Sequence, residues 1–460
     1  MYTAFVTKLK NLHKHPNADR LQIGECFGNN VVVSMEYEDN QLGIYFPSDG
    51  QLSIEFAEAN NLLSKKDDAG NNIGGYMDPD KRNVTAIKLR GEKSDGIFLP
   101  LTSLEPFGDI TILKEGDKID VFNGKEICKK YIPNKQNRIG SVSAGNKTRK
   151  TKVPVAPLFM EHADTEQLAY NLGAFKPGDE IEITLKMHGT SQRTGYLPTL
   201  KGYKRTIIDR LLRREGKPIY DWGYVSGTRR VVLENYGGGY YGDNAFREAH
   251  SKVFEGKLEK GETVYYEVVG FTDTGAPIMA TCSNKKLNDK DFIKQYGEET
   301  IFSYGCDPKG TQNMYGHDEE GPFAIECVVP TSDIYVYRMT ITNEDGFVVE
   351  YTPDFMRYRC EQMGIKTVPV MWRGIVDYNG DVPSEYNTIG NIVKDIAEQF
   401  YDGPDPIGKT HIREGVVVRI INRPKFCAYK HKNWFFKALS GISLEAVNPD
   451  SVDPDILSEM

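Results

Sequence analysis

The chain has 460 residues, enough for two or three domains, and its 39% hydrophobic content is enough for ordinary buried cores. The sequence has no run of about 18 apolar residues, so we expect no membrane-spanning helix. It also lacks a signal-peptide pattern, so we expect no leader. The net charge of -8 excludes a simple basic sleeve for nucleic acid. Seven scattered cysteines without a C-x-x-C pair argue against a zinc site or a disulfide framework and favour the reducing cytoplasm.

Two short boxes stand out near the start of the chain, His-Pro-Asn-Ala-Asp-Arg-Leu at 15–21 and Arg-Gly-Glu-Lys-Ser-Asp-Gly at 90–96. The Pro-Asn pair favours a turn that presents Asp19 and Arg20 for mutual pairing, and the two glycines permit tight strand corners. The boxes resemble the tRNA-binding-type OB-fold domain that is appended to some aminoacyl-tRNA synthetases. The resemblance implies a small OB-type β-barrel over residues 1–128, a fold that commonly binds oligonucleotides. The alternative is that the boxes are only structural corners.

A Gly/Ser/Asn-rich stretch at 129–155 follows and predicts a basic flexible linker. Its positive charges either form a solvated face, as such runs usually do, or contact phosphates, most strongly at low salt. Between 129 and 152 it has no acidic residue and eight basic ones: Lys129, Lys130, Lys135, Arg138, Lys147, Arg149, Lys150 and Lys152.

The segment Lys-Met-His-Gly-Thr at 186–190 places Lys186 at the end of an apolar, strand-like run and just before a glycine turn. A lysine nucleophile would stand at such a position, and so would an ordinary solvated lysine. A free lysine has a pKa of ~10.4, so a lysine that attacks at neutral pH needs burial or adjacent positive charge to lower that pKa.

A second basic cluster lies between 201 and 217, and residues 206–214 within it have the spacing of a short amphipathic helix. Phosphate contact and a solvated face are both open for this cluster.

Five downstream segments follow in a fixed order. Together with 186–190 they resemble motifs I, Ia, III, IIIa, IV and V of the covalent nucleotidyltransferases, the superfamily of polynucleotide ligases and mRNA capping enzymes. These five are the Ser-Gly-Thr-Arg-Arg segment at 226–230, Glu267 in an apolar strand, Tyr337 in 334–338, Glu414 before the apolar strand 415–418, and the pair Lys430 and Lys432 on one strand face.

The resemblance implies a role for each of these residues. Lys186 attacks the nucleoside triphosphate, and Lys430 and Lys432 act with it by gripping the triphosphate and supplying positive charge. Glu267 and Glu414 bind the ribose and a divalent metal, Mg²⁺ or Mn²⁺, which suits oxygen ligands. The remaining nucleotide-binding residues are His188 and Gly189 of motif I, Arg229, which holds a phosphate, and Tyr337, which stacks on the purine.

Several alternatives stay open. Arg230 could replace Arg229, and Tyr335 could replace Tyr337, which is otherwise a cross-strand packing residue. The superfamily more often has aspartate where this chain has His188, so metal ligation at 188 is not expected. Either glutamate taken alone could be a surface-paired carboxylate, and the two lysines could be the polar face of an edge strand.

We expect an α+β fold: an antiparallel-sheet nucleotidyltransferase (adenylyltransferase) domain of the ATP-grasp-like type over 156–445, preceded by the OB-type barrel. Strands are predicted at 264–269, 334–342, 346–351 and 415–421, and helices at 354–363 and 388–401. An acidic, disordered tail is predicted at 446–460. The 28 residues after Lys432 are fewer than the roughly 70 of a further OB domain.

This combination resembles one branch of the ATP-dependent RNA ligases, which join 5'-phosphate and 3'-hydroxyl RNA ends through lysyl-AMP and RNA-adenylate intermediates in RNA repair. ATP and Mg²⁺ (or Mn²⁺) are the implied cofactors, and RNA is the implied partner of a cytoplasmic monomer that binds no membrane. The alternatives are a GTP-dependent capping-type guanylyltransferase, a DNA ligase, or a non-catalytic tRNA-binding protein.

Overall fold

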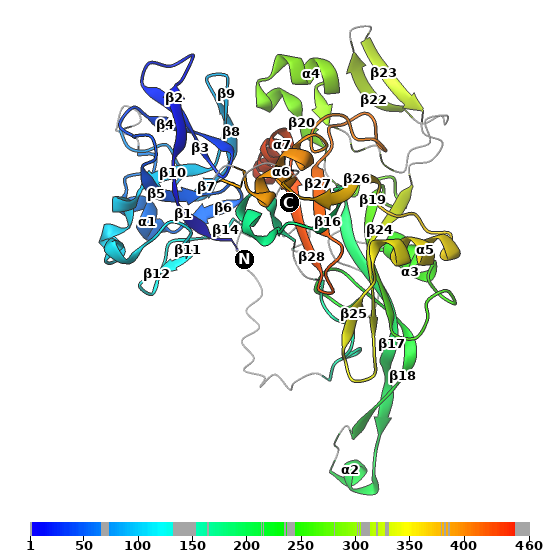
Figure 1. The fold of residues 1–460 in the computed structure, drawn as a ribbon. Helices are drawn as coiled ribbons and strands as arrows, with labels where there is room; N and C mark the ends of the chain where they lie inside the picture. Colours follow the sequence, from blue (N-terminus) through cyan, green and yellow to red (C-terminus); the bar gives the residue numbers. More distant parts are fainter. Residues whose placement is uncertain are drawn as a thin grey trace. The chain divides into compact units, whose positions relative to one another are not determined.

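The computed structural model contains two compact units, each described below by itself (Figure 1). Unit 1 combines Met1–Lys135, Cys282–Ile293 and Trp434–Asp450, and unit 2 contains the rest of the chain. The described residues are 2–65, 73–131, 153–162, 165–212, 214, 216–233, 236, 244–279, 281–300, 302, 304, 313–318, 321–326, 331–378, 380, 383–384 and 387–446. Among them no helix is long and apolar enough to cross a membrane.

Unit 1 is built from short antiparallel strands. One sheet has the order β10 (Ile97–Pro100), β5 (Leu42–Phe46), β1 (Ala4–Lys8), β11 (Lys118–Ile119), and a second has β14 (Cys128–Lys130), β6 (Gly50–Leu52), β7 (Asn83–Val84). A third is β2 (Lys10–Lys14), β3 (Leu21–Cys26), β4 (Asn29–Ser34), and two hairpins are β8 (Ala86–Leu89) with β9 (Glu92–Asp95) and β12 (Val121–Phe122) with β13 (Lys125–Glu126). The pairing described for this unit does not close into a ring, and the OB-type barrel stays a prediction.

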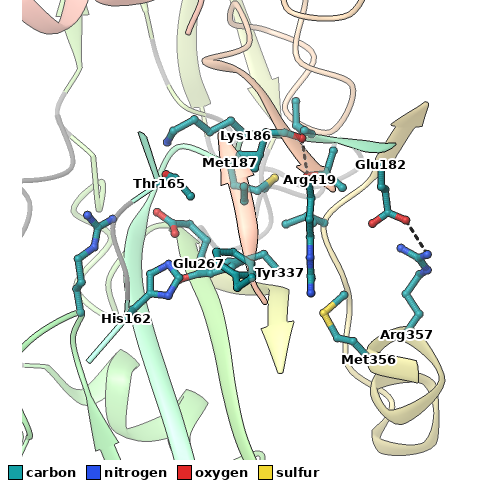
Figure 2. Close-up of a pocket in the computed structure, with 17 residues that line it drawn as sticks. His162, Thr165, Glu182, Lys186, Met187, Glu267, Tyr337, Met356, Arg357 and Arg419 are labelled. Atoms are coloured by element: carbon teal, nitrogen blue, oxygen red, sulfur yellow. Dashed lines mark hydrogen bonds and ion pairs between the residues drawn. The ribbon is translucent and has the colours of Figure 1, made fainter. Parts of the chain in front are cut away.

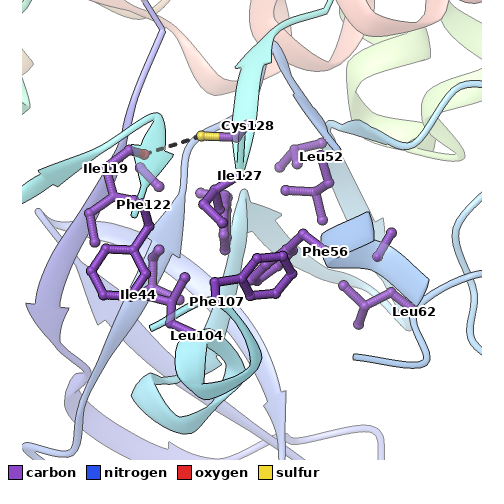
Figure 3. Close-up of a cluster of buried hydrophobic side chains, with 14 of the residues drawn as sticks. Ile44, Leu52, Phe56, Leu62, Leu104, Phe107, Ile119, Phe122, Ile127 and Cys128 are labelled. Carbon is purple, nitrogen blue, oxygen red and sulfur yellow. Dashed lines mark hydrogen bonds between the residues drawn. The ribbon is translucent and has the colours of Figure 1, made fainter. Parts of the chain in front are cut away.

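Side chains from the first two sheets, from β12 and from the short helices share one hydrophobic core (Figure 3). Ile44 of β5 and Leu52 of β6 meet Phe56 of helix α1 (Ile54–Ala59) and Phe107 of the 3-10 helix η1 (Leu101–Phe107), which η2 (Ile110–Ile112) follows. Helix α1 starts at this point because the Ser53 hydroxyl accepts a hydrogen bond from the Phe56 amide and so satisfies one of the free donors of the first turn. The core ties α1 and η1 to the sheets of unit 1.

The two sequence boxes contact one another in unit 1. His15 is buried; its Nδ1 accepts from the Asn17 amide at 3.0 Å, and its Nε2 donates to the Leu89 carbonyl at 3.1 Å. The Asn17 side chain donates to the Arg90 carbonyl at 3.0 Å. Asp19 pairs with Lys14 at 3.3 Å, so its predicted pairing with Arg20 is wrong: β2 brings the lysine to this side of the turn. The boxes therefore act as structural corners here.

Unit 2 contains two five-stranded sheets. The first has the order β15 (Glu166–Gln167), β28 (Cys427–Lys432), β27 (Gly415–Ile420), β16 (Asp179–Leu185), β26 (Val370–Val376), and only its β15–β28 pair is parallel. The second has the order β18 (Lys217–Gly227), β17 (Thr190–Lys204), β19 (Glu262–Gly270), β24 (Ser332–Thr342), β25 (Val348–Glu350), and is antiparallel. The predicted α+β class with antiparallel sheets is confirmed.

Helices α5 (Pro353–Met363) and α6 (Ile389–Glu398) occupy the predicted positions. Thr352 and Thr388 cap their first turns, and Gly364, with φ of +69°, ends α5. The apolar face of α6 packs on the first sheet, where Val393 joins Ile183 and Val418 in one core. The other described elements are α2 (Ile207–Leu211), α3 (Ala245–Lys252), α4 (Lys290–Tyr296), η3 (Leu168–Tyr170), η4 (Leu172–Ala174), η5 (Asn284–Leu287), β20 (Cys282–Ser283), β21 (Glu299–Thr300), β22 (Asn313–Asp318) and β23 (Gly321–Glu326).

The division into units differs from the predicted domain boundaries at three places, one of which is Cys282–Ile293, a segment of the predicted nucleotidyltransferase domain that belongs to unit 1. Lys129 and Lys130 belong to strand β14, while the rest of the basic cluster and the acidic tail after 446 lie outside the described residues. Helix α7 (Trp434–Ala446), predicted within the nucleotidyltransferase domain, belongs to unit 1. Lys437 of α7 pairs with Asp95 at 2.6 Å, and the carbonyl of buried Leu439 accepts from the Cys282 thiol.

Candidate active site

One face of the first sheet of unit 2 lines a cavity with about 820 Å³ of empty space, which includes its open mouth (Figure 2). Alternation along the strands turns Ile183 and Val418 toward α6, and their neighbours Thr184, Val417 and Arg419 toward the cavity. The complete lining is His162, Thr165, Glu182, Thr184, Leu185, Lys186, Met187, Arg229, Glu267, Tyr337, Met356, Arg357, Val368, Val417, Arg419, Phe426 and Ala428.

Lys186 follows directly after β16, and its amide donates to the Gly415 carbonyl at 3.0 Å, which fixes it beside the start of β27. Its Nζ lies 2.8 Å from Oε1 of Glu414. Gly189 allows the loop to approach β19, because a Cβ at 189 would lie 2.3 Å from the Val268 carbonyl oxygen. The sequence-predicted nucleophile therefore lies in the cavity, and motif I contacts the strand of motif III.

Glu414 is the centre of a buried charge cluster and is only 2% exposed. Its Oε1 also lies 3.2 Å from Nζ of Lys432, and its Oε2 lies 3.5 Å from Nδ1 of His188. Burial would raise the pKa of Glu414, but the charges of Lys186 and Lys432 and the hydrogen bond from His188 outweigh it and hold that pKa well below its usual range. The carboxylate is therefore ionised and shared by two lysines.

His188 is buried against Phe302, with ring centroids 4.3 Å apart. Burial lowers the pKa of His188, although Glu414 acts in the opposite direction. The ring is therefore neutral at pH 7 and can donate one hydrogen bond to the carboxylate. The structure thus places His188 as a partner of Glu414.

Lys430 and Lys432 lie on the same face of β28 as Ala428, which lines the cavity. Lys432 is almost fully buried, and Lys430 is half-buried opposite Val417 of β27. The intervening His431 points to the other side, where its ring stacks on Tyr401. Of the two lysines, Lys432 is the one that forms an ion pair with Glu414.

Glu267, Tyr337 and Arg229 line the same cavity as Lys186. Figure 2 shows Glu267, Tyr337 and His162 grouped together below the lysine. Arg229 rather than Arg230 is among the lining residues, and Tyr337 rather than Tyr335.

Tyr337 lies at a β-bulge of strand β24. Tyr266 pairs with Val336 and Tyr265 pairs with Arg338, which leaves Tyr337 as the extra residue of β24. The Tyr337 hydroxyl lies 3.0 Å from Ser191 Oγ, and its ring is 5.3 Å from that of His162. Tyr335, the partner of Glu267, is buried outside the cavity lining.

Sequence reasoning missed several charged residues of the cavity. Glu182 of β16 is 2% exposed and accepts from Arg357 of α5 at 2.7 Å. Arg419 of β27 donates to Glu350 at 3.2 Å, and Glu350 also pairs with Arg338. Glu182 stands with Glu180 and Thr184 on the polar side of an alternating strand, which is typical of a solvent-facing side and gave no signal of a cavity. A single arginine on α5 gave none either.

Among the described residues, no group of three or more His, Cys, Asp or Glu side chains is placed to hold a metal ion. Mg²⁺ keeps several waters and is commonly bound through one or two carboxylates plus substrate phosphates. The pair Glu267 and Glu414, one lining the cavity and one buried at Lys186, fits that mode of binding.

Neither the family models nor the curated proteins contain a match to this chain. Solved structures of the RNA ligase of Naegleria gruberi do match it. The structure with pyrophosphate has a TM-score of 0.52 at 15% identity and covers 94% of this chain and 96% of that one. A variant with ATP and manganese gives 0.51 at 14%, covering 98% and 99%, and another with AMP and manganese gives 0.51 at 14%, covering 97% and 99%. The chain therefore shares its fold with that RNA ligase.

Proposed function

We propose that this protein is an ATP-dependent RNA ligase that joins 5'-phosphate and 3'-hydroxyl RNA ends in RNA repair. The observation that carries the proposal is the position of Lys186 in a cavity that it shares with Arg229, Glu267 and Tyr337. The Naegleria gruberi ligase, whose structures contain ATP, AMP, manganese or pyrophosphate, has the same fold and supports this assignment.

In the first step Nζ of Lys186 attacks the α-phosphorus of ATP. A P–N bond forms, the bond from the α-phosphorus to the bridging oxygen breaks, and pyrophosphate leaves. Lys186 must lose a proton and its ion pair with Glu414 to attack, and Lys432, 3.2 Å from the same Oε1, can keep the carboxylate paired when Lys186 leaves.

The other residues bind and orient the nucleotide. Tyr337 stacks on the adenine, Arg229 and Lys430 contact phosphates, and neutral His188 keeps Glu414 in place. A bound Mg²⁺ or Mn²⁺, held by Glu267 and Glu414, would neutralise charge on the phosphates. Because the surrounding groups are already fixed by β-strands, little reorganisation is needed when the charge develops.

The two later steps transfer and release the nucleotide. An oxygen of the RNA 5'-phosphate attacks the phosphorus of lysyl-AMP, the P–N bond breaks, and a 5'–5' pyrophosphate linkage forms. The RNA 3'-hydroxyl then attacks the 5'-phosphorus of the RNA and displaces AMP. The second and third steps therefore need RNA at the mouth of the cavity.

The proposal includes RNA binding by the N-terminal unit and by the basic segment 129–155, and a monomer that works in the cytoplasm. RNA binding by unit 1 has to be tested in the full chain. Removing residues 1–152 would take away Asp95, the ion-pair partner of Lys437 in α7, and would expose the apolar side of that helix.

The test is incubation of the protein with α-labelled ATP or GTP and magnesium, followed by denaturing electrophoresis. We expect label from ATP on the protein that acid releases and base does not, as for a phosphoramidate, and transfer of that label to 5'-phosphorylated RNA. Labelling by GTP alone would instead indicate a guanylyltransferase, labelling without transfer to RNA but with transfer to DNA a DNA ligase, and no labelling a non-catalytic protein.

A further inference from the structure

The hairpin of β17 and β18 continues beyond the sheet to which it belongs (Figure 1). Strand β17 pairs with β19 only from Thr190 to Gly195, whereas its pairing with β18 continues to Lys204 and Lys217. Helix α2 lies at the end of this extension. We call residues 196–224 the arm.

The far half of the arm is strongly basic in an acidic protein. Residues 201–220 contain seven Lys or Arg and two Asp or Glu, while the whole chain has a net charge of -8. Lys201, Lys204 and Lys217 are exposed. A concentration of positive charge on one element of an acidic protein is typical of a surface that binds a polyanion.

The near half of the arm presents aromatic rings on one face. The cross-strand partners Tyr196 and Tyr224 stack at 4.7 Å between centroids with an interplanar angle of 19°. Trp222 lies 5.8 Å from Tyr196, and Nζ of Lys260 lies 5.2 Å from the Trp222 ring. These rings are half-buried, so each keeps some exposed surface. Exposed aromatic faces flanked by lysines are typical of surfaces on which unpaired bases stack.

The arm is continuous with the candidate active site. Strand β18 runs from Lys217 at the far end to Gly227, two residues before Arg229, which lines the cavity. A nucleic-acid strand whose end lies at Arg229 can therefore follow β18 outward, past the aromatic rings and then the lysines.

The end of the arm carries apolar side chains with nothing to bury them. Ile207 is 84% exposed and Leu211 is 83% exposed, and Ile208 and Leu212 are exposed as well. Aliphatic side chains at the tip of a basic element can insert between base steps and hold them apart.

We propose that the arm is a binding surface for RNA next to the joining site: its lysines contact phosphates, its aromatic face stacks unpaired bases, and its apolar tip holds a base step open. The inference rests on the proposed function for the identity of the nucleic acid. It adds to that function a path along which the enzyme holds its substrate outside the cavity.

The test uses the full-length protein and a fluorescent 5'-phosphorylated RNA oligonucleotide without ATP. The arm variant is K201Q/K204Q/K217Q, and the matched control, K176Q/K252Q/K366Q, removes the same charge from exposed sites elsewhere in unit 2. We expect the arm variant to lose at least about tenfold in RNA affinity and about 2 from the slope of log Kd against log salt, as for three lost phosphate contacts. Self-adenylation with labelled ATP should equal that of the control.

A second variant, I207S/L211S, tests the tip. We expect weaker RNA binding with an unchanged salt slope, because no charge is removed. Wild-type RNA affinity in both arm variants would overturn the proposal and leave the tip as a contact for another protein. Because the binding assay needs no ATP, a failure of self-adenylation in the wild-type protein would reject the ligase proposal without deciding the role of the arm.

Discussion

The boxes at 15–21 and 90–96 and the motifs between 186 and 432 both match sequence patterns of known families, but their polar side chains end in different places. In unit 1, His15 and Asn17 bond to the backbone carbonyls of Leu89 and Arg90, at the start of the other box. Asp95 is buried against Lys437. In unit 2, Lys186, Glu267 and Tyr337 converge on a cavity from three strands or strand ends. A matching pattern thus indicates chemistry where the side chains face open space, and architecture where they satisfy the backbone.

Among the cavity residues, substitution of Lys186, the proposed nucleophile, should have the largest effect on adenylation and joining. We expect Lys186→Ala to abolish the covalent adenylate and the joining of 5'-phosphate RNA, because no other group replaces the nucleophile. Lys366→Ala, an exposed ion-paired lysine of the same unit, is the control. Some sealing of pre-adenylated RNA should survive, since that step needs no lysine nucleophile. An adduct that persists in Lys186→Ala would remove this lysine from the mechanism.

Substitution of the two carboxylates, Glu267 and Glu414, should have the next largest effect on joining. Glu414→Gln and Glu267→Gln keep the size of each side chain but remove its charge, and preorganised groups of this kind contribute ~3 kcal/mol to a transition state. We therefore expect a loss of at least about 100-fold in joining, measured with saturating ATP and titrated magnesium. Unaltered metal-dependent joining in either variant would place that carboxylate outside the site.

Substitution of Tyr337, the tyrosine that lines the cavity, should have a smaller effect, on ATP binding. Loss of an aromatic stacking partner costs about 1–3 kcal/mol per base, so Tyr337→Leu should weaken ATP binding about tenfold or more. The KM for ATP in the adenylation step measures this. Tyr335→Leu, the same substitution at a ring outside the cavity lining, should leave that KM unchanged. The reverse pattern would mean that Tyr335 is the base platform.

A substitution in the box at 15–21 should lower the unfolding free energy of unit 1 and leave adenylation unchanged. His15→Ala removes a buried ring with two hydrogen bonds to backbone, so we expect a loss of roughly 2–3 kcal/mol in the unfolding free energy of unit 1. Urea denaturation measures it, and adenylation assayed below the transition should match wild type. Reduced adenylation with unchanged stability would show that the box takes part in function.

The smallest expected effect is on how the unfolding free energy of unit 2 depends on pH. Burial lowers the pKa of His188, so the unfolded chain binds a proton at higher pH than the folded one, and stability falls as the pH drops below the unfolded value of ~6.5. The pKa of Glu414 is held low, so its contribution is present above ~4.3 and is lost at still lower pH. His188→Gln should therefore flatten the dependence of the unfolding free energy of unit 2 on pH just below 6.5. An identical slope in the variant would mean that His188 ionises alike in both states.

The sequence predicted the class of the fold and the strands that position the candidate site, because the apolar runs at 264–269 and 415–418 and the caps of α5 and α6 are local signals. It also singled out Lys186 and Glu414, since a charged residue at the end of an apolar strand is visible in one dimension, and the structure places their side chains 2.8 Å apart. It did not predict the strands of the arm, although its basic cluster and the helix at its tip were both singled out.

Other features depended on the tertiary structure. Tyr337 rather than Tyr335 lines the cavity, and Tyr337 is the extra residue at a bulge in β24, a feature that no local signal in the sequence marks. Glu182 meets Arg357 across 175 positions of sequence, and α7 packs in unit 1 although it follows the last motif of unit 2 directly. A linear pattern specifies which face of an element is apolar, but packing decides which distant element covers that face.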